Sequence, residues 1–585
     1  MKLKSKLKNI KKGLDKSRNN LSSMDLSDIN RLYKKLLKKL PDISHLKSIV
    51  LFSGLATLVI LIMFAQRFTA IRKYLPTKPT TGGIYVEGMV GEIKQLNPLY
   101  SPTNFAEDSA ISLIFSGLTK NTSGREVVGD LAESWEISKD KRTYTFKLKD
   151  NIFWHDGEAL DADDVYFTYK TIQNPDTNSP RLATWKDVEV KIIDEKTISF
   201  VLPNVYVSFI YLTDVPILPE HILRDIQVSN LRSSEFSTKP IGSGPFLFKE
   251  LKNIKDVEEV HLQFNKNYYE GRPYLDGIVL KSFSNYGSLT YAYSRKDVDG
   301  VYRVRPYDLD REGHLPNLAI YNLAIPEYDA LFFNLGSQAV KDKKLREAIS
   351  LVIDKNKIIS DVYHDEAIKI HSALLPGYLG FDPKIKQKYG TSEAKEVLAS
   401  AGYKKNKDGH LVKDGEVVTI RLVSTDEELK NREAQMTKKM IESLGVVVNH
   451  ESYPLKTFIE EMVRPRNYDL VLVTQNLGPD SDIYTFYHTN MASDPGINLS
   501  ALKNRQVDKY LEEARMSHDK KFRELRYSEV VKYINAEYAA LYTAWPGYLY
   551  GVSKKVSGIE SAKLSNPKDR FWNVRNWHIF EERDY

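Results

Sequence analysis

The segment 131–169 constrains the fold more than any other part of the chain, because it specifies a strand, a turn and a helix in direct succession. In the strand Thr143–Leu148 every second residue is apolar, so one face is expected to be buried. Asp161 can cap the N-terminus of the helix, and Asp164 follows near the positive end of the helix dipole. The inner face of this helix is predicted to consist of Val165, Thr168, Tyr169 and Ile172.

Length and composition predict a globular body of two or more domains. The chain has 585 residues, of which 42% are hydrophobic and 28% are charged, values typical of folded rather than disordered proteins. The net charge of +7 arises in residues 1–47, which hold 14 lysine or arginine residues and four aspartates, so the remaining 538 residues carry −3. A basic tail on a nearly neutral body does not indicate binding to nucleic acid. Since the chain contains no cysteine, disulfides, thiolate metal sites and a cysteine nucleophile are excluded.

An uncharged segment of 19 residues at 48–66 predicts a transmembrane anchor. At about 1.5 Å per residue a helix of this length nearly spans a hydrocarbon core of ~30 Å. Basic residues are more numerous before the segment than after it, which places the tail 1–47 in the cytoplasm and the body outside a single-pass cell-membrane protein. A cleaved signal peptide stays open as an alternative, although the apolar run is long for one. Proline, threonine and glycine make 67–81 a predicted linker.

Several short motifs follow one another along the body in a fixed order. They are LNP at 96–98, FSGL at 115–118, PIGSGPF at 240–246, NKNYY at 265–269, GRPYLDGI at 271–278 and YD at 468–469. Together with the segment 131–169, their order and spacing resemble those of the bacterial extracellular solute-binding proteins of family 5. These proteins are the oligopeptide, dipeptide and nickel receptors of ABC transporters.

The resemblance implies an α/β fold of the type II periplasmic-binding-protein class, with two lobes joined by a hinge of two strands. The ranges it implies are 82–123, 189–285 and 541–585 for lobe I, 124–188 for an extra subdomain of lobe I, and 286–540 for lobe II. Ligand is then expected in a cleft between the lobes.

Two motifs have the residue types of a chemical site. His155, Asp156 and Gly157 lack a second histidine or carboxylate at metal-ligand spacing, and the segment 242–245 lacks the G-x-S-x-G pattern of a nucleophilic serine. The first is predicted to be a structural turn and the second a tight loop near the cleft. We therefore expect neither an enzyme nor a metal or cofactor site.

Seven ligand-binding residues are predicted from the resemblance. They are Thr103, Asn104, Phe105, Arg181, Asp480, Asp482 and Trp545. The residues at 103–105 and Arg181 stand where peptide-binding members contact their ligand, and Trp545 where they place an aromatic residue. An ordinary surface loop at 103–105 and core packing of Trp545 are the alternatives.

The segment 475–482 departs from the family pattern. Peptide-binding members place an aspartate a few residues beyond the YD strand, where it pairs with the α-amino group of the ligand. Alignment on Tyr468 and Asp469 puts Gly478 at that position, and a shift of two residues supplies Asp480. Because a buried ammonium without a carboxylate is costly, either Asp480 takes this role or the receptor does not grip free N-termini in this way. Ordinary acidity of a loop is the further alternative.

The sequence thus predicts a monomeric, membrane-anchored receptor that captures oligopeptides and delivers them to an ABC permease. A nickel chelate, an oligosaccharide or another solute is the alternative ligand within the same class. A peptide-sensing or chaperone-like receptor without import is the alternative from a different class.

Overall fold

The computed structural model describes residues 44–74, 77–100, 104–309, 315 and 317–583, together with 30, 31, 34, 35 and 38. The chain divides into two compact units, Met1–Lys78 with Glu581–Tyr585, and Pro79–Phe580. Most of the predicted tail 1–47 lies outside the described residues.

The first unit contains the helix α3 (Ser44–Tyr74). The helix continues through 67–74, which were predicted as linker, because no proline interrupts it before Pro76. Over the part of the chain that the structure describes, no helix combines the length and the apolar character needed to cross a membrane. The anchor predicted at 48–66 stays a prediction.

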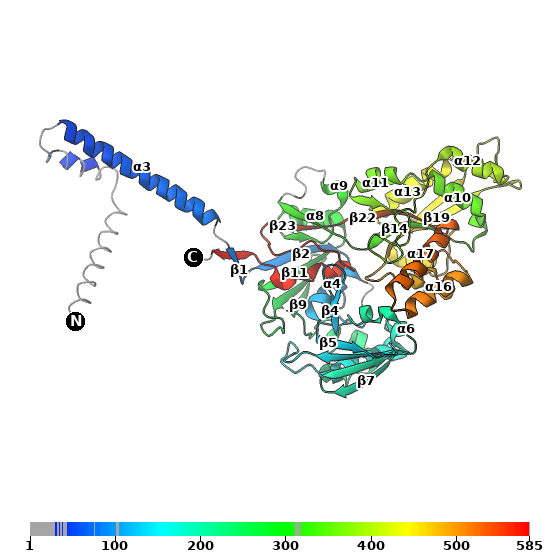
Figure 1. Cartoon of the computed structure of the whole chain (residues 1–585), viewed down its shortest axis with the longest axis horizontal. Coiled ribbons are helices and arrows are strands. Elements are labelled where there is room, and N and C mark those ends of the chain that lie inside the picture. The colour runs from blue at the N-terminus through cyan, green and yellow to red at the C-terminus, as the bar shows by residue number, and fades with distance from the viewer. Residues whose placement is uncertain are drawn as a thin grey trace. The chain divides into compact units, whose positions relative to one another are not determined.

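Lobe I of the second unit is built on a seven-stranded sheet (Figure 1). In spatial order its strands are β13 (Leu318–Leu323), β23 (Tyr548–Ser553), β12 (Gly300–Val301), β2 (Ile84–Val90), β11 (Gly277–Phe283), β10 (Val257–Phe264) and β9 (Phe246–Ile254). The central strand β2 pairs in parallel with β11 and β12, while the outer strands are antiparallel. The helices α4 (Phe105–Ile114) and α8 (Tyr286–Ser294) pack against this sheet.

The segment 131–169 folds as predicted. Its strands β5 (Ala132–Ile137) and β6 (Thr143–Leu148) belong to a four-stranded sheet, which β8 (Thr197–Val201) and β7 (Glu189–Asp194) complete. The helix α5 (Ala162–Gln173) begins with a capping box in which Asp161 and Asp164 each accept a backbone hydrogen bond. All four predicted inner-face residues of α5 are buried, and it packs on β7 and β8.

Lobe II is built on a six-stranded sheet covered by helices on both faces (Figure 1). Its strands are, in spatial order, β15 (Ala367–Lys369), β22 (Ala540–Pro546), β14 (Glu327–Phe333), β21 (Leu470–Asn476), β19 (Thr419–Thr425) and β20 (Val447–Tyr453). One face packs on α10 (Lys343–Val352), α11 (Lys355–Tyr363), α12 (Thr391–Ser400) and α13 (Glu428–Glu442). The other face packs on α16 (Arg505–Met516) and α17 (Lys520–Ala536).

The chain passes between the two large sheets at two places. β13 of lobe I continues into β14 of lobe II through residues 324–326, and β22 of lobe II returns to β23 of lobe I through Gly547. This arrangement is the two-lobed α/β fold that the sequence predicts, and such paired crossings can bend together as a hinge.

Several strands belong to other sheets than the predicted lobe ranges imply. β7 and β8 fall within the range expected for lobe I but pair with β5 and β6, while β12 and β13, expected in lobe II, belong to the sheet of lobe I. Most of β22 lies beyond residue 540 but pairs within lobe II. Hydrogen-bonding partners that are distant in sequence decide which sheet a strand joins. The order of the motifs along the chain therefore does not predict these lobe boundaries.

The two motifs that resemble chemical sites contact each other and form a structural joint. His155 donates its backbone N–H to Gly242 O (2.8 Å), and its Nε2 lies 3.1 Å from Gly244 O. Its Nδ1 accepts a hydrogen bond from Gly242 N (3.2 Å). A side chain at Gly242 or Gly244 would overlap the Ile114 carbonyl group, so glycine is required at both positions.

We expect His155 to make the stability of the protein depend on pH. Burial lowers the pKa of His155 to about 4 from an ordinary 6.5, and the Gly244 carbonyl offsets only part of this effect. Below pH 6.5 the unfolded chain therefore binds a proton that the folded chain excludes, and stability decreases as the pH falls towards 4. His155→Gln should remove about 2 kcal/mol of the difference in unfolding free energy between pH 7 and pH 4.5.

Urea unfolding at the two pH values measures this difference. His410→Gln, at an exposed histidine, is the matched control and should retain the dependence of the wild type. An equal dependence in His155→Gln and the wild type would contradict the assignment.

Candidate functional site

The surfaces where the two lobes meet are held by polar contacts. The described residues form two hydrophobic clusters in lobe I and two in lobe II. None of these clusters combines buried residues of 328–545, in lobe II, with buried residues from the rest of the body. Interfaces of this kind permit relative motion of domains.

Asp480 links the lobes. It follows β21 in lobe II and accepts a hydrogen bond from Arg523 Nη2 at 2.6 Å. It also accepts a hydrogen bond from the hydroxyl group of Ser208, which lies in the short helix η2 (Val207–Leu212) of lobe I. Only 13% of the Asp480 side chain and 9% of the Arg523 side chain are exposed, so both charges are largely removed from water.

Asp482 repeats this arrangement two residues later. Arg515 Nε donates to Asp482 Oδ2 at 2.8 Å, and Tyr206 Oη of lobe I donates to the same oxygen at 3.2 Å. The Arg515 guanidinium also lies over the rings of Tyr206 and Tyr484, 4.6 and 4.1 Å from their centroids. We call the group of Tyr206, Ser208, Asp480, Asp482, Arg515 and Arg523 the Asp480–Asp482 contact.

The electrostatics of the Asp480–Asp482 contact keep both arginines charged. Burial by itself lowers the pKa of Arg515 and of Arg523, but the carboxylates of Asp482 and Asp480 raise both pKa values above the ordinary range. Each aspartate is therefore neutralised by a cation of its own lobe and oriented by a hydroxyl group of the other lobe.

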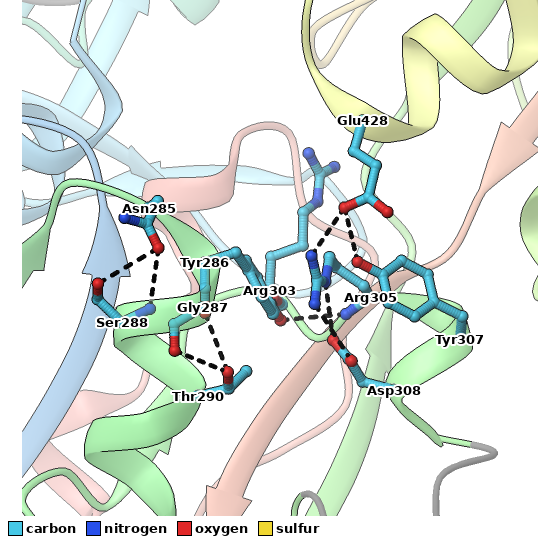
Figure 2. Close-up of polar contacts among 10 residues, drawn as sticks. All are labelled: Asn285, Tyr286, Gly287, Ser288, Thr290, Arg303, Arg305, Tyr307, Asp308 and Glu428. Atoms are coloured by element: carbon cyan, nitrogen blue, oxygen red, sulfur yellow. Dashed lines mark hydrogen bonds and ion pairs between the residues drawn. The ribbon is translucent and has the colours of Figure 1, made fainter.

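Further contacts connect the lobes, among them an ion pair between Arg303 Nη2 of lobe I and Glu327 Oε2 of β14 at 2.6 Å. Asn476 Nδ2, at the end of β21, donates to Ser565 O of lobe I at 3.2 Å. At another place Glu428, the first residue of α13, accepts hydrogen bonds from Arg305 Nη1 (2.9 Å) and Tyr307 Oη (2.7 Å) of lobe I (Figure 2). Arg305 is in turn held by Asp308 at 2.8 Å.

The predicted residues of the loop 103–105 have identifiable neighbours, except Thr103, which lies outside the described residues. Asn104 caps α4, since its Oδ1 accepts hydrogen bonds from the backbone N–H groups of Ala106 and Glu107, and its Nδ2 donates to Glu92 O at 2.6 Å. Phe105 lies 5.1 Å from the Tyr302 ring and 5.1 Å from the Arg570 guanidinium. Asn104 and Phe105 are therefore held within lobe I by a helix cap and an aromatic contact.

Arg181 belongs to a charged group in lobe I. It precedes the short helix α6 (Leu182–Trp185), and its Nε is buried without a hydrogen-bond partner. Burial lowers the pKa of Lys568, and the charge of Arg181 lowers it further. Asp214 and two other aspartates outweigh both effects and raise this pKa above the ordinary range. Lys568 Nζ lies 3.5 Å from Asp214 Oδ2.

A cavity of about 120 Å³ in lobe I is lined by Asp214, Lys568 and Asp569. Burial raises the pKa of Asp569 to about 7. The motifs did not identify these three residues, because Asp214 and Lys568 are separated by most of the chain and neither belongs to a recognisable pattern.

Trp545 lies at the return crossing between the sheets. Its Nε1 donates to Ile325 O, in the other crossing segment, at 2.7 Å. None of the hydrogen bonds or ion pairs of the described residues links Trp545, Asn104 or Arg181 directly to Asp480 or Asp482. The structure thus places Asp480 and Asp482 in one contact, Asn104, Phe105 and Arg181 elsewhere on lobe I, and Trp545 at a crossing.

We expect the hydrogen bond from Ser208 to Asp480 to favour the closed arrangement of the lobes. A hydrogen bond to a charged group contributes about 1.5–3 kcal/mol, so Ser208→Ala should reduce the ratio of closed to open molecules about tenfold. Because the chain contains no cysteine, Lys139→Cys and Lys407→Cys, both at exposed positions, allow dye labelling and measurement of single-molecule energy transfer.

Ser337→Ala is the matched control, since Ser337 donates to Asp469 within lobe II alone. It should leave the distance distribution unchanged. If Ser208→Ala also leaves it unchanged, the hydrogen bond does not control closure.

Comparison with known proteins agrees with this architecture. The model of the family described as bacterial extracellular solute-binding proteins, family 5 Middle, matches residues 126–496. Oligopeptide-binding protein AppA of Bacillus subtilis (strain 168) is 29% identical over 517 residues, which cover 86% of this chain and 92% of AppA.

Two solved structures have the same fold. AppA from Bacillus subtilis in complex with a nonapeptide has a TM-score of 0.75 and 27% identity, and the match covers 86% of this chain and 100% of AppA. NikZ from Campylobacter jejuni in complex with Ni(L-His) has a TM-score of 0.75 and 26% identity, with 85% of this chain and 99% of NikZ covered. Since the family model matches more than half of a chain that also has the two-lobed fold, the chain belongs to family 5 of the bacterial extracellular solute-binding proteins, whose members bind solutes rather than catalyse reactions.

Proposed function

We propose that the protein is a membrane-anchored receptor outside the cytoplasm that captures oligopeptides between its lobes and delivers them to an ABC importer. The observation that carries the proposal is that two separate apolar cores meet through polar side chains and are joined by two short crossings. A body of this kind can open to admit a ligand and close around it without disturbing either core.

Binding is coupled to closure because the ligand has a different affinity for the open and the closed form of the protein. A ligand that contacts both lobes interacts more strongly with the closed form and shifts the population towards it. The Asp480–Asp482 contact supplies part of the closing free energy from the protein itself. The closed form is then the form that a permease would recognise.

Similarity to AppA, whose structure holds a nonapeptide, supports an oligopeptide as the ligand. An extended peptide can pair its backbone with strand edges, which gives affinity with little dependence on sequence. The structure of NikZ with Ni(L-His) supports a metal chelate as the second candidate.

The proposal of a membrane anchor rests on the uncharged segment 48–66 and the excess of positive charge before it. Protease added outside intact cells should remove the body and leave the tail 1–47 protected. Release of the full-length chain by a high-salt wash would contradict anchoring by this segment.

Calorimetry of the full chain in detergent against a library of peptides of two to ten residues tests the ligand. We expect saturable binding of peptides and, in small-angle scattering, a smaller radius of gyration on binding. Ni(L-His) and short oligosaccharides serve as comparators. Binding of a comparator alone, with no heat from any peptide, would replace the peptide assignment.

A second prediction concerns the N-terminus of the ligand. Because Arg523 and Arg515 already neutralise Asp480 and Asp482, neither carboxylate is available for an α-ammonium group. We therefore expect N-acetylation of a bound peptide to change its affinity by less than about threefold, below about 0.7 kcal/mol. A loss of 30-fold or more would show that an aspartate leaves its arginine to pair with the ligand.

A further inference from the structure

Lobe II contains a cavity of about 570 Å³ that the proposed function does not use. It lies among α10, the N-terminus of α11, the segment 384–388 and the end of α17. None of the residues that line it belongs to lobe I or to the Asp480–Asp482 contact.

The cavity contains a buried lysine without an acidic partner. Lys355 is 5% exposed, and its Nζ donates to Ile370 O at 2.9 Å and lies 3.4 Å from His371 Nδ1. No ion pair of the described residues includes Lys355. It is also the first residue of α11, where the positive end of the helix dipole opposes a cation.

The environment of Lys355 is costly for a cation by itself. Burial, followed by the nearby charge of Lys369, lowers the pKa of Lys355 well below its ordinary range. A bound anion would offset both effects.

His371 also lines this cavity. Its Nδ1 accepts a hydrogen bond from Gln387 N at 3.2 Å, which assigns the ring proton to Nε2. Burial, Lys355, Lys369 and Lys386 lower the pKa of His371 to about 4, so the ring is neutral at physiological pH and Nε2 is a donor.

Two residues that line the cavity each carry a polar atom that is buried without a partner. One is Ser350 Oγ, on a residue that is 2% exposed, and the other is Gln387 Oε1. Gln387 donates its Nε2 to Ser350 O, which assigns the remaining amide atom as an acceptor. Two neighbouring residues that line the cavity therefore carry an unused hydroxyl donor and an unused acceptor.

The rim of the cavity adds positive charge. Lys384, Lys386 and Lys388 line it and are exposed, and none of them takes part in an ion pair of the described residues. Two carboxylates also line it. Glu347 is paired with Lys344 at 2.8 Å, and Glu393 lies in the first turn of α12.

We propose that this cavity binds a phosphate group, either inorganic phosphate or a phosphate monoester. Its oxygens accept from Lys355, Ser350 and His371, and the rim lysines attract it. A protonated phosphate oxygen donates to Gln387 Oε1. Sulfate is fully deprotonated, so it has no proton to donate and leaves Gln387 Oε1 without a hydrogen bond. The site is separate from the ligand held between the lobes.

Calorimetry of the full chain at constant ionic strength tests the proposal with sodium phosphate, glycerol 3-phosphate and sodium sulfate. We expect one saturable site for at least one of the phosphates and at least tenfold weaker binding of sulfate. The phosphate that binds more tightly distinguishes the free anion from the monoester.

Ser350→Ala should weaken phosphate binding about tenfold, and Lys384→Gln, Lys386→Gln and Lys388→Gln combined should weaken it at least tenfold. The triple lysine variant changes only exposed residues on the rim, so it leaves the core unchanged. Lys404→Gln, Lys405→Gln and Lys407→Gln combined are the matched control, because they remove the same charge from exposed positions of lobe II that do not line the cavity. No saturable heat with either phosphate, equal affinity for sulfate, or equal loss in the control would overturn the proposal.

Discussion

The body depends on two strand crossings, at 324–326 and Gly547, where its backbone passes between the two sheets. Because each lobe has its own apolar core, these crossings and the side chains that face each other set how the lobes are arranged. The hydrogen bond from Trp545 to Ile325 O ties one crossing to the other, so the two are expected to bend as one unit.

The facing side chains give the arrangement of the two lobes a specific geometry. A carboxylate paired with an arginine in one lobe and hydrogen-bonded to a hydroxyl group in the other contributes direction as well as attraction. The contact occurs twice, at Asp480 and Asp482, and it leaves both carboxylates occupied. If the ligand is a peptide, as we propose, this occupancy makes its affinity depend on its backbone and length rather than on a free N-terminus.

Local sequence was sufficient for the elements whose causes are local. The alternation in Thr143–Leu148 and the cap at Asp161 act within a few residues, and the structure confirms both. Family motifs extended this prediction to the two-lobed fold. They did not place β12, β13 and β22 in the correct sheets, because strand pairing depends on partners that are distant in sequence.

The sequence by itself determined that the chain has an α/β body with capped helices, and it predicted that the motif at 155–157 is a structural turn and that 242–245 is a tight loop. Only the tertiary structure decided that these two motifs are bonded to each other and that Asp480 faces Arg523 and Ser208. It also decided that Lys355 lies buried beside His371 and the unpartnered Ser350 hydroxyl group. The physical reason is range: capping and periodicity act over one or two turns, whereas charge pairing and burial are set by residues that folding brings together from distant parts of the chain.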